Sequence, residues 1–290
     1  MTLSIIIPAY NAADTIERTV LNVLQAAVQV EGGADVWVVD DGSTDRTPGI
    51  LDRMAENPSL HIIHQSNCGA YQARLAALRR MHSEYFGFVD ADDEVDPTMF
   101  EKMIALAKRD HLDVVQCGYD GDGVVGLATK GNRLLKTRDE VFTEYIQPRL
   151  IDIKESSFVW DKVYRNQFDF SSFDETDHVT NFDDLIFNTH FFLSVQSMGF
   201  INEPLYHHIP TENSAVRTFS ASKIKDFRET IRIRRALLPA YGVSSRGRTN
   251  LMWFNRNCLN GIKMTLRAHD FSFVDKIRCI WRLILLRRGL

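Results

Sequence analysis

Acidic side chains crowd together in one short segment of the chain, FVDADDEVDP at residues 88–97. The segment contains five acidic residues: Asp90, Asp92, Asp93, Glu94 and Asp96. Like charges so close together repel one another unless something offsets them. Carboxylate oxygens are also the ligands that Mg²⁺ and Mn²⁺ favour. The segment therefore fits either a solvated acidic turn or a site built for a cation.

Two other polar clusters, PAYN at 8–11 and DDGSTD at 40–45, also follow short hydrophobic runs. Taken singly, each cluster is explained by a turn or a helix cap as well as by a binding site. In open α/β sheets, however, ligands bind beyond the carboxyl ends of the strands. The placement of three polar clusters at the ends of three predicted strands therefore favours a binding site.

Strand and helix patterns alternate in the first part of the chain. Short continuous apolar runs indicate buried strands, and apolar positions at helical spacing indicate helices. The predicted strands span 3–8, 35–40, 60–64, 85–90 and 112–119, and the predicted helices span 11–30, 42–57, 69–83 and 96–110. The alternation predicts an α/β fold with a Rossmann-like, mostly parallel sheet flanked by helices. Beyond residue 118 it stops, and helices are predicted at 138–147 and 182–198.

The composition is that of an ordinary globular protein, with 290 residues, 44% hydrophobic and 25% charged. Four scattered cysteines without a C-x-x-C pair argue against a zinc site and favour free thiols in a reducing compartment. The N-terminal segment lacks the basic start of a signal peptide. No run approaches the roughly 20 apolar residues of a membrane helix. These features predict a cytoplasmic protein.

The sequence narrows the class of nucleotide site. It contains neither G-x-G-x-x-G after the first strand nor G-x-x-x-x-G-K-[ST], so neither a dinucleotide fold nor a P-loop is supported. Carboxylates stand where those sites place glycine amides. Carboxylates cannot bind phosphate directly, but a divalent cation can bridge the two.

An ordered set of motifs over residues 3–215 resembles the inverting family 2 glycosyltransferases, which have the GT-A fold. The motifs are SIIIPAYNAADTIERTV, VWVVDDGSTDRT, NCGAYQAR, FVDADD, FDDLIFNTHFF and PLYHH. The resemblance implies a GT-A glycosyltransferase domain at 1–215. The remaining residues, 216–290, are then a helical and basic C-terminal extension.

The resemblance implies a nucleotide pocket at the ends of the strands. Tyr10 would stack on the base, and Asp41 would accept a hydrogen bond from the N3–H of uracil. Arg74 would reach the base or the diphosphate, although a solvated helix arginine is the alternative. The implied nucleotide-binding residues are Pro8, Ala9, Tyr10, Asn11, Asp41, Asn67, Gly69, Arg74, Asp90 and Ala91.

The resemblance also implies a metal site and a catalytic base. Asp92 would be the main ligand of Mn²⁺ or Mg²⁺, and Asp90 would complete the metal site, nearer the ribose and the metal's waters. Inversion requires a base that takes the proton of the attacking acceptor hydroxyl. Asp184 is the predicted base, and Asp183 stands where the family usually has glutamate. A helix N-cap is the alternative role for either aspartate.

Further residues are candidates for contact with the acceptor or the diphosphate. Trp160 would pack under a sugar, with core packing as the alternative, and Lys162 would reach diphosphate or acceptor. His208 and Ser214 lie in the segment that closes over the diphosphate in relatives. Asp183 completes this group of candidates.

The net charge of −4 conceals a strong asymmetry. Residues 1–214 contain 17 Lys and Arg against 34 Asp and Glu, whereas residues 215–290 contain 17 against 4. The last segment predicts a basic amphipathic helix with Val274, Ile277, Ile280, Trp281 and Ile284 on one face. Such a helix binds an anionic membrane surface, or it packs on its own domain or on a second subunit. The sequence leaves these alternatives open.

The expected function is metal-dependent transfer of a sugar from a nucleoside diphosphate sugar, most simply a UDP-sugar. The acceptor would be a hydroxyl of a saccharide or lipid-linked saccharide in cell-surface polysaccharide synthesis, at the inner face of the cell membrane. The alternatives are a nucleotidyltransferase that makes a nucleotide sugar and an inactive nucleotide-binding relative. No nucleic-acid recognition motif accompanies the basic tail.

Overall fold

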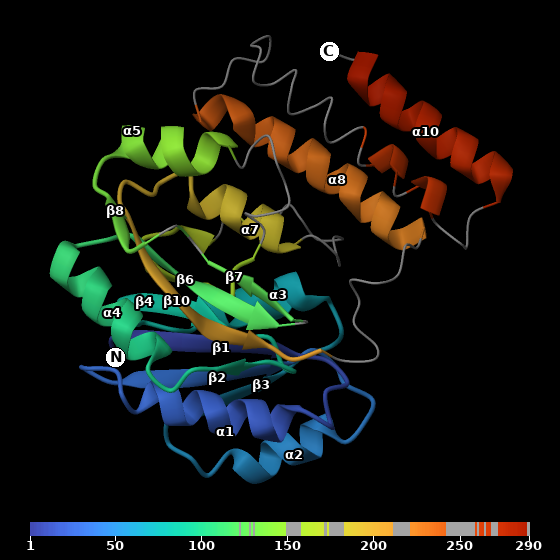
Figure 1. The fold of residues 1–290 in the computed structure, drawn as a ribbon. Coiled ribbons are helices and arrows are strands. Elements are labelled where there is room, and N and C mark those ends of the chain that lie inside the picture. Colours follow the sequence, from blue (N-terminus) through green and yellow to red (C-terminus); the bar gives the residue numbers. More distant parts are fainter. Residues whose placement is uncertain are drawn as a thin grey trace. The chain divides into compact units, whose positions relative to one another are not determined.

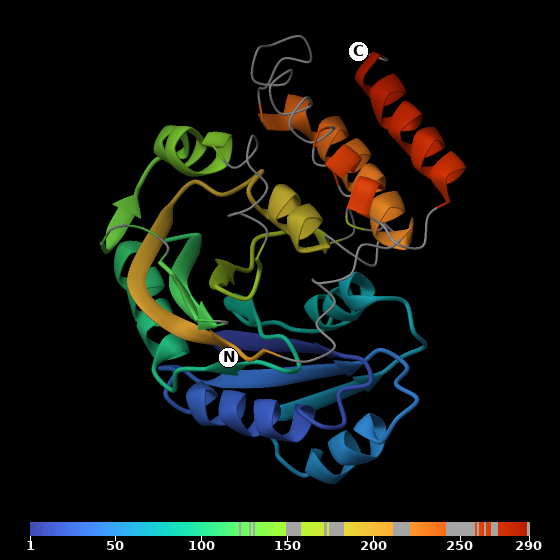
Figure 2. The same cartoon turned by 45° about the vertical axis from the view of Figure 1, so that its right-hand side comes forward.

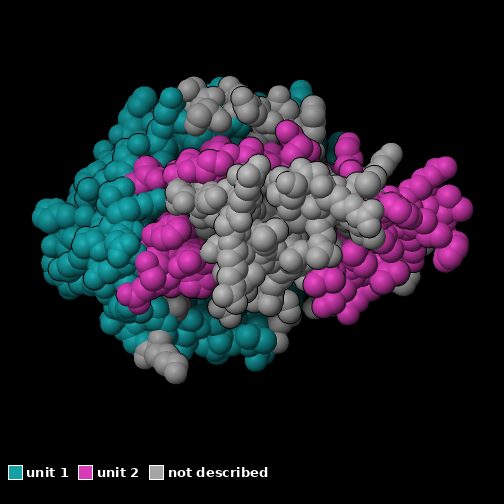
Figure 3. All heavy atoms as spheres, turned by 90° about the horizontal axis from the view of Figure 1, so that it is seen from above, with its two compact units in different colours: residues 1–141, 159–177, 195–212 teal, residues 142–158, 178–194, 213–290 magenta. Residues whose placement is uncertain are grey.

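The computed structural model divides the chain into two compact units (Figure 3). The first contains residues 1–141, 159–177 and 195–212, and the second contains residues 142–158, 178–194 and 213–290. These boundaries differ from the predicted domain boundary at residue 215, and the predicted division into a glycosyltransferase domain and an extension stays a prediction. The structure describes residues 1–121, 123–127, 129, 131–148, 158–170, 173, 183–210, 221–241, 259, 261–263, 265–267 and 272–288.

The first unit is built on a mixed sheet with the strand order β3-β2-β1-β4-β9-β6-β10-β5 (Figure 1). The strands are β1 (Leu3–Ala9), β2 (Ala34–Asp40), β3 (Leu60–His64), β4 (Tyr85–Phe88), β5 (Glu94–Val95), β6 (Val114–Gly121), β7 (Val124–Gly126), β8 (Arg133–Leu135), β9 (Lys162–Arg165) and β10 (Met198–His208). Strands β3, β2, β1 and β4 run parallel, as do β6 and β10. Strand β9 runs antiparallel to both β4 and β6 and joins the two parallel groups. The predicted α/β fold with a mostly parallel central sheet is confirmed.

Helices cover both faces of the parallel strands. The helices of this unit are α1 (Ile16–Ala27), α2 (Thr47–Met54), α3 (Ala70–Leu78), α4 (Met99–Asp110) and α5 (Arg138–Glu140). Figures 1 and 2 show α1 and α2 on one face of β1 to β3 and α3 on the other. Strand β1 is covered on both faces, which explains why LSIIIPA is apolar without alternation.

Besides the π-helix at Val141–Ile146, the described part of the second unit contains three labelled α-helices. These are α7 (Asp183–Phe191), α8 (Ala221–Leu237) and α10 (Phe273–Arg288), with a turn of 3₁₀ helix at Leu238–Tyr241. Helices α7 and α8 pack against one another. In the part of the chain that the structure describes, no helix is both long and apolar enough to cross a bilayer.

Two sequence predictions need correction. The helix predicted at 182–198 ends at Phe191, and β10 begins at Met198. The strand predicted at 85–90 ends at Phe88, which leaves Asp90 in the following turn. Both errors arise at segment ends, where apolar spacing continues into the next element and carries no stop signal.

We expect Ile6→Ala to lower the free energy of unfolding by about 2–5 kcal/mol, because it removes a fully buried side chain from the central strand β1. Leu21→Ala is the matched control. The Leu21 side chain is exposed, so its loss changes stability by about 0.5 kcal/mol or less. Urea denaturation followed by circular dichroism measures both. Equal effects of the two substitutions would contradict this account of the core.

Candidate functional site

The loops that follow β1 and β2 are tied together by short hydrogen bonds. The Asn11 backbone N–H donates to Ser43 Oγ at 2.9 Å, and the Asn11 side-chain oxygen accepts from the Thr44 N–H at 2.8 Å. Asn11 adopts a left-handed conformation with φ of 51°, which asparagine tolerates better than most residues. Pro8 and Ala9 pair with β2 just before this turn. Tyr10 lies at the turn with half of its surface exposed, so its ring is accessible for stacking.

Asp41 organises the neighbouring loop at 65–69. Its buried carboxylate accepts from Gln65 Nε2 at 2.8 Å and from the backbone N–H groups of Cys68 and Gly69 at 2.9 and 2.7 Å. A carboxylate has roughly four acceptor positions, so these bonds occupy most of them. The sequence predicts a bond to uracil here, and it did not reveal that Asp41 holds the loop.

A glycine brings the β2 loop against the 65–69 loop. Gly42 has a φ of 72°, and a Cβ at that position would lie 2.6 Å from the backbone nitrogen of Asn67. Only glycine combines this backbone conformation with such a close approach. Gly69 stands just before α3 at a φ of 89°, and the predicted nucleotide-binding roles of Asn67 and Gly69 stay predictions.

Arg74 is a buried residue of α3. Its guanidinium donates to Asp90 Oδ1 at 3.1 Å and lies 5.7 Å from the centre of the Phe88 ring. The Arg74 side chain is only 5% exposed, so the alternative of a solvated helix arginine is wrong. Arg74 and Asp90 thus form one ion pair at the end of β4.

Asp93 is fully buried and holds the acidic segment against the end of β10. Its carboxylate accepts from the Tyr206 hydroxyl at 2.7 Å and from the Ile209 backbone N–H at 2.9 Å, and it lies 3.0 Å from His208 Nδ1. The Tyr206 hydroxyl accepts in turn from the Asp90 backbone N–H at 3.1 Å. Burial is the main reason why the pKa of Tyr206 is raised far above its ordinary value, so the hydroxyl keeps its proton. Tyr206 is not among the residues that the sequence predicts at the site.

Helix α1 fixes the backbone of the same segment from another side. Thr19 Oγ1 lies within hydrogen-bond distance of the carbonyl groups of Ala91 and Asp93. The Asn22 side chain exchanges two hydrogen bonds with the backbone of Val95. Arg18 donates to the Asp92 carbonyl at 2.7 Å. In the sequence, the signal for these contacts is the presence of polar residues on the buried face of an amphipathic helix.

Asp92 is the acidic side chain that these contacts leave unbalanced. In the described part of the chain, its carboxylate accepts no hydrogen bond from another residue. Burial raises its pKa and repulsion by Asp93 adds to this rise, while the charges of His208 and Arg18 offset part of it. The hydrogen bond with Asp93 raises the pKa of His208 on the same edge. A partly buried carboxylate that accepts no hydrogen bond from another described residue fits a bound cation.

Two carboxylates alone do not make a complete metal site. Among the described residues, no group of three or more His, Cys, Asp or Glu is arranged to hold an ion. Mg²⁺ is commonly held by one or two carboxylates together with waters and substrate phosphates. Asp92 and Asp90 therefore fit a cation whose remaining ligands come from elsewhere.

Two acceptor candidates lie in the protein interior. The Trp160 ring stacks on Tyr206 with centroids 4.2 Å apart and is only 6% exposed. The Lys162 ammonium group is fully buried and lies 2.6 Å from Asp161 Oδ1. These are the contacts of core residues, which is the alternative that the sequence left open for Trp160.

The remaining candidates divide between the units. His208 ends β10 in the first unit. Asp183 and Asp184 open α7 in the second unit, where Asp183 is buried and Asp184 is partly exposed. The roles of these two aspartates stay predictions. Ser214 lies outside the described residues.

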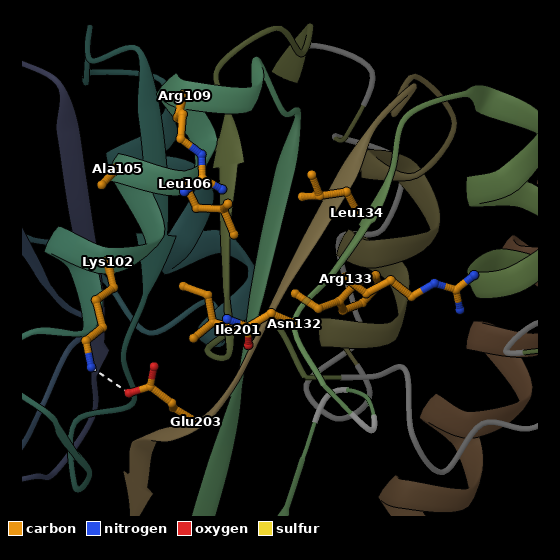
Figure 4. A pocket seen from close by; sticks show the side chains of 10 residues that line it. Lys102, Ala105, Leu106, Arg109, Asn132, Arg133, Leu134, Ile201 and Glu203 are labelled. Atoms are coloured by element: carbon orange, nitrogen blue, oxygen red, sulfur yellow. Dashed lines mark hydrogen bonds and ion pairs between the residues drawn. The ribbon is translucent and has the colours of Figure 1, made fainter.

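A separate pocket of about 500 Å³ lies between α4, β8 and β10 (Figure 4). Leu106 and Ile201 contribute apolar surface, and Lys102 pairs with Glu203 at 2.5 Å beside them. None of the predicted site residues lines it. The pocket is therefore separate from the predicted site residues.

Comparison with known sequences identifies relatives over most of the chain. The sequence model described as "Glycosyl transferase family 2" matches residues 4–176. The chain is 31% identical over 220 residues to the uncharacterized glycosyltransferase YibD of Escherichia coli (strain K12), a match that covers 74% of this chain and 63% of that protein. It is 27% identical over 294 residues to the glycosyltransferase GlyG of Streptococcus pneumoniae, covering 96% and 93%.

Some relatives are longer than this chain. The matches to YibD and to the uncharacterized glycosyltransferase EpsJ of Bacillus subtilis span only 63% and 62% of those proteins. Among solved structures, S. aureus TarS 1-349 in complex with UDP aligns with a TM-score of 0.63 at 18% identity, covering 100% of this chain and 92% of that one. At such identity the likeness shows the fold, which is of the GT-A type.

The chain should lose stability in acid through His190 on α7. Burial lowers the pKa of His190 from 6.5 to about 4, so the unfolded chain binds this proton between these pH values and the folded chain does not. Stability therefore falls as pH drops from about 6.5 towards 4, by at most about 3 kcal/mol.

Urea unfolding at several pH values measures the effect in the wild type and in His190→Gln. The substitution should flatten the dependence in this window. His82→Gln, which alters an exposed ring, should leave it in place. Identical pH dependence in the wild type and His190→Gln would contradict the assignment.

Proposed function

The chain belongs to glycosyl transferase family 2, and from this premise we propose that it is a metal-dependent inverting glycosyltransferase that uses a UDP-sugar. The unbalanced Asp92 carboxylate is the observation that carries this proposal. It follows β4 just after Asp90, which pairs with Arg74, and β4 pairs with β1, the strand that Tyr10 directly follows. An aromatic ring, a buried cation and an unbalanced carboxylate suit a base, a diphosphate and a metal ion.

The donor would bind along the ends of β1, β2 and β4. Tyr10 stacks on the base, and Asp41 uses its remaining acceptor capacity for the N3–H of uracil. Arg74 is already oriented by Asp90, so little side-chain entropy is lost when it meets the nucleotide. The structures of TarS with UDP and with UDP-GlcNAc support UDP as the nucleotide, and they leave the sugar open.

Asp92 and Asp90 would hold the metal together with the donor diphosphate. When bound, Mn²⁺ or Mg²⁺ neutralises the charge that develops on the leaving diphosphate. His208 lies on the same edge, where Asp93 orients its ring and favours its protonated form. It would add positive charge beside the diphosphate.

Asp184 would act as the general base. It takes the proton of the acceptor hydroxyl while the oxygen attacks the anomeric carbon from the face opposite the diphosphate. The new glycosidic bond forms as the bond to the diphosphate breaks, which inverts the anomeric centre. The UDP then leaves as an anion.

An amphiphilic acceptor is supported by the hairpin of β6 and β7. Val124, Val125 and Leu127 there are 56%, 61% and 48% exposed. Gly121 of β6 pairs with His208 on one side and with Val124 on the other, so the hairpin adjoins the donor edge. An exposed apolar surface at this place suits the lipid part of a lipid-linked saccharide.

The names of two relatives bear on the acceptor and the pathway. A cholesterol galactosyltransferase of Borreliella burgdorferi and a putative teichuronic acid biosynthesis glycosyltransferase of Bacillus subtilis both match part of this chain. From these names we infer a role for this chain in cell-surface polysaccharide synthesis at the cytoplasmic face of the membrane. Membership of the family disfavours the nucleotidyltransferase alternative. An inactive nucleotide-binding relative would neither transfer nor hydrolyse a UDP-sugar.

Transfer and slow hydrolysis of a UDP-sugar should require Mn²⁺ or Mg²⁺ and should fall at least about 100-fold in Asp92→Ala. Release of UDP measures both reactions. Asp139→Ala, which removes an exposed carboxylate on α5, should behave as the wild type. Activity that survives both Asp92→Ala and a chelator would refute the metal-dependent proposal.

Asp184→Asn should separate binding from catalysis. It should keep the thermal stabilisation by UDP and Mn²⁺ and lose transfer by about 10²- to 10⁴-fold, because the base is gone while the donor edge is intact. The neighbouring Asp183→Asn is the matched control and should retain more activity. The opposite order of effects would move the base to Asp183.

A further inference from the structure

Helix α10 exposes a row of large apolar side chains. Phe273, Val274, Ile277 and Trp281 are 78%, 54%, 43% and 54% exposed. At 100° per residue these four positions fall within an arc of about 100° around the helix axis. Isolated exposed apolar residues are common, but a continuous stripe on one helix face marks an interaction surface.

The opposite side of α10 is already packed. Cys279 is buried, and the buried Thr265 hydroxyl lies 3.6 Å from its sulfur. Lys276 donates to the Leu266 carbonyl at 3.0 Å. The helix therefore docks through the Cys279 side and leaves the apolar stripe outside, which disfavours the alternative that this stripe packs on its own domain.

The charges of α10 indicate the partner. The helix contains Lys276, Arg278, Arg282, Arg287 and Arg288 against a single acid, Asp275. Arg278 lies next to the stripe along the helix surface and its side chain is 72% exposed. A second copy of the chain would bring an equally basic segment against this one, and like charges across an interface are unfavourable. An anionic lipid surface offers both apolar depth and opposite charge.

We propose that α10 is an interfacial helix that lies on an anionic membrane, with Phe273, Val274, Ile277 and Trp281 inserted among the lipids. At about 1.5 Å per residue its 16 residues extend about 24 Å, and its basic residues suit a helix lying in the membrane plane. The inference does not depend on sugar transfer, because it rests on the second unit alone.

Co-sedimentation of the full chain with vesicles tests the proposal. The wild type should bind vesicles that contain phosphatidylglycerol and should bind pure phosphatidylcholine at least about tenfold more weakly, with high salt removing the difference. The double variant Ile277→Ser with Trp281→Ser should bind the anionic vesicles at least about tenfold more weakly. Leu21→Ser with Val28→Ser, which alters an exposed apolar residue of α1 and another just beyond its end, should bind as the wild type does.

The outcomes distinguish the occupants. Absence of binding by the wild type, or equal binding by wild type and the α10 variant, would overturn the proposal. So would a concentration-dependent dimer that the α10 variant abolishes without any change in vesicle binding, which would assign the stripe to a second copy. Unchanged thermal stabilisation of the variant by UDP and Mn²⁺ would show that the variant is folded and that donor binding is a separate property.

Discussion

Repulsion among the five carboxylates of residues 90–96 is the constraint that the surrounding structure must offset. Each acid meets a different environment. Asp90 pairs with Arg74, Glu94 pairs with Arg18 of α1, and Asp96 bonds the backbone and hydroxyl of Thr98 at the start of α4. Asp93 is buried among three donors from the end of β10. The remaining charge is concentrated on one carboxylate, that of Asp92.

This distribution of charge also explains how distant segments are brought to one edge. Tyr206 bonds both Asp93 and the backbone of Asp90, so the end of β10 is fixed against the turn after β4. Trp160 stacks on the same tyrosine and supports it from the core. Together with the contacts from α1 and α3, this means that three separate parts of the chain hold the acidic turn. A site held this way is preorganised before any donor arrives, which lowers the entropic cost of binding.

The sequence predicts what depends on local patterns. The strands and helices of residues 3–110 were found because each has its own apolar period and its own polar end, and the three polar clusters follow from these ends. The antiparallel strand β9 was missed, since its pairing with β4 and β6 joins segments far apart in the chain. Contacts of Thr19 and Asn22 with the acidic turn were missed for the same reason.

Burial was the second property that the sequence could not supply. Lys162 and Trp160 are candidates for ligand contact in the sequence, yet the fold places both in the interior. Asp41 was expected to serve the base, and most of its acceptor capacity holds the 65–69 loop. Residue type indicates which chemistry is available, whereas packing decides which atoms are accessible.

The central claim is that Asp92 completes a cation site only together with the donor diphosphate. Titration of the protein with Mn²⁺, with free Mn²⁺ measured by electron paramagnetic resonance in the absence and presence of UDP, tests it directly. Because two carboxylates alone bind the ion weakly, UDP should raise the affinity of the protein for Mn²⁺ at least about tenfold. Equal affinity with and without UDP, or no binding of Mn²⁺ in the presence of UDP, would contradict the account.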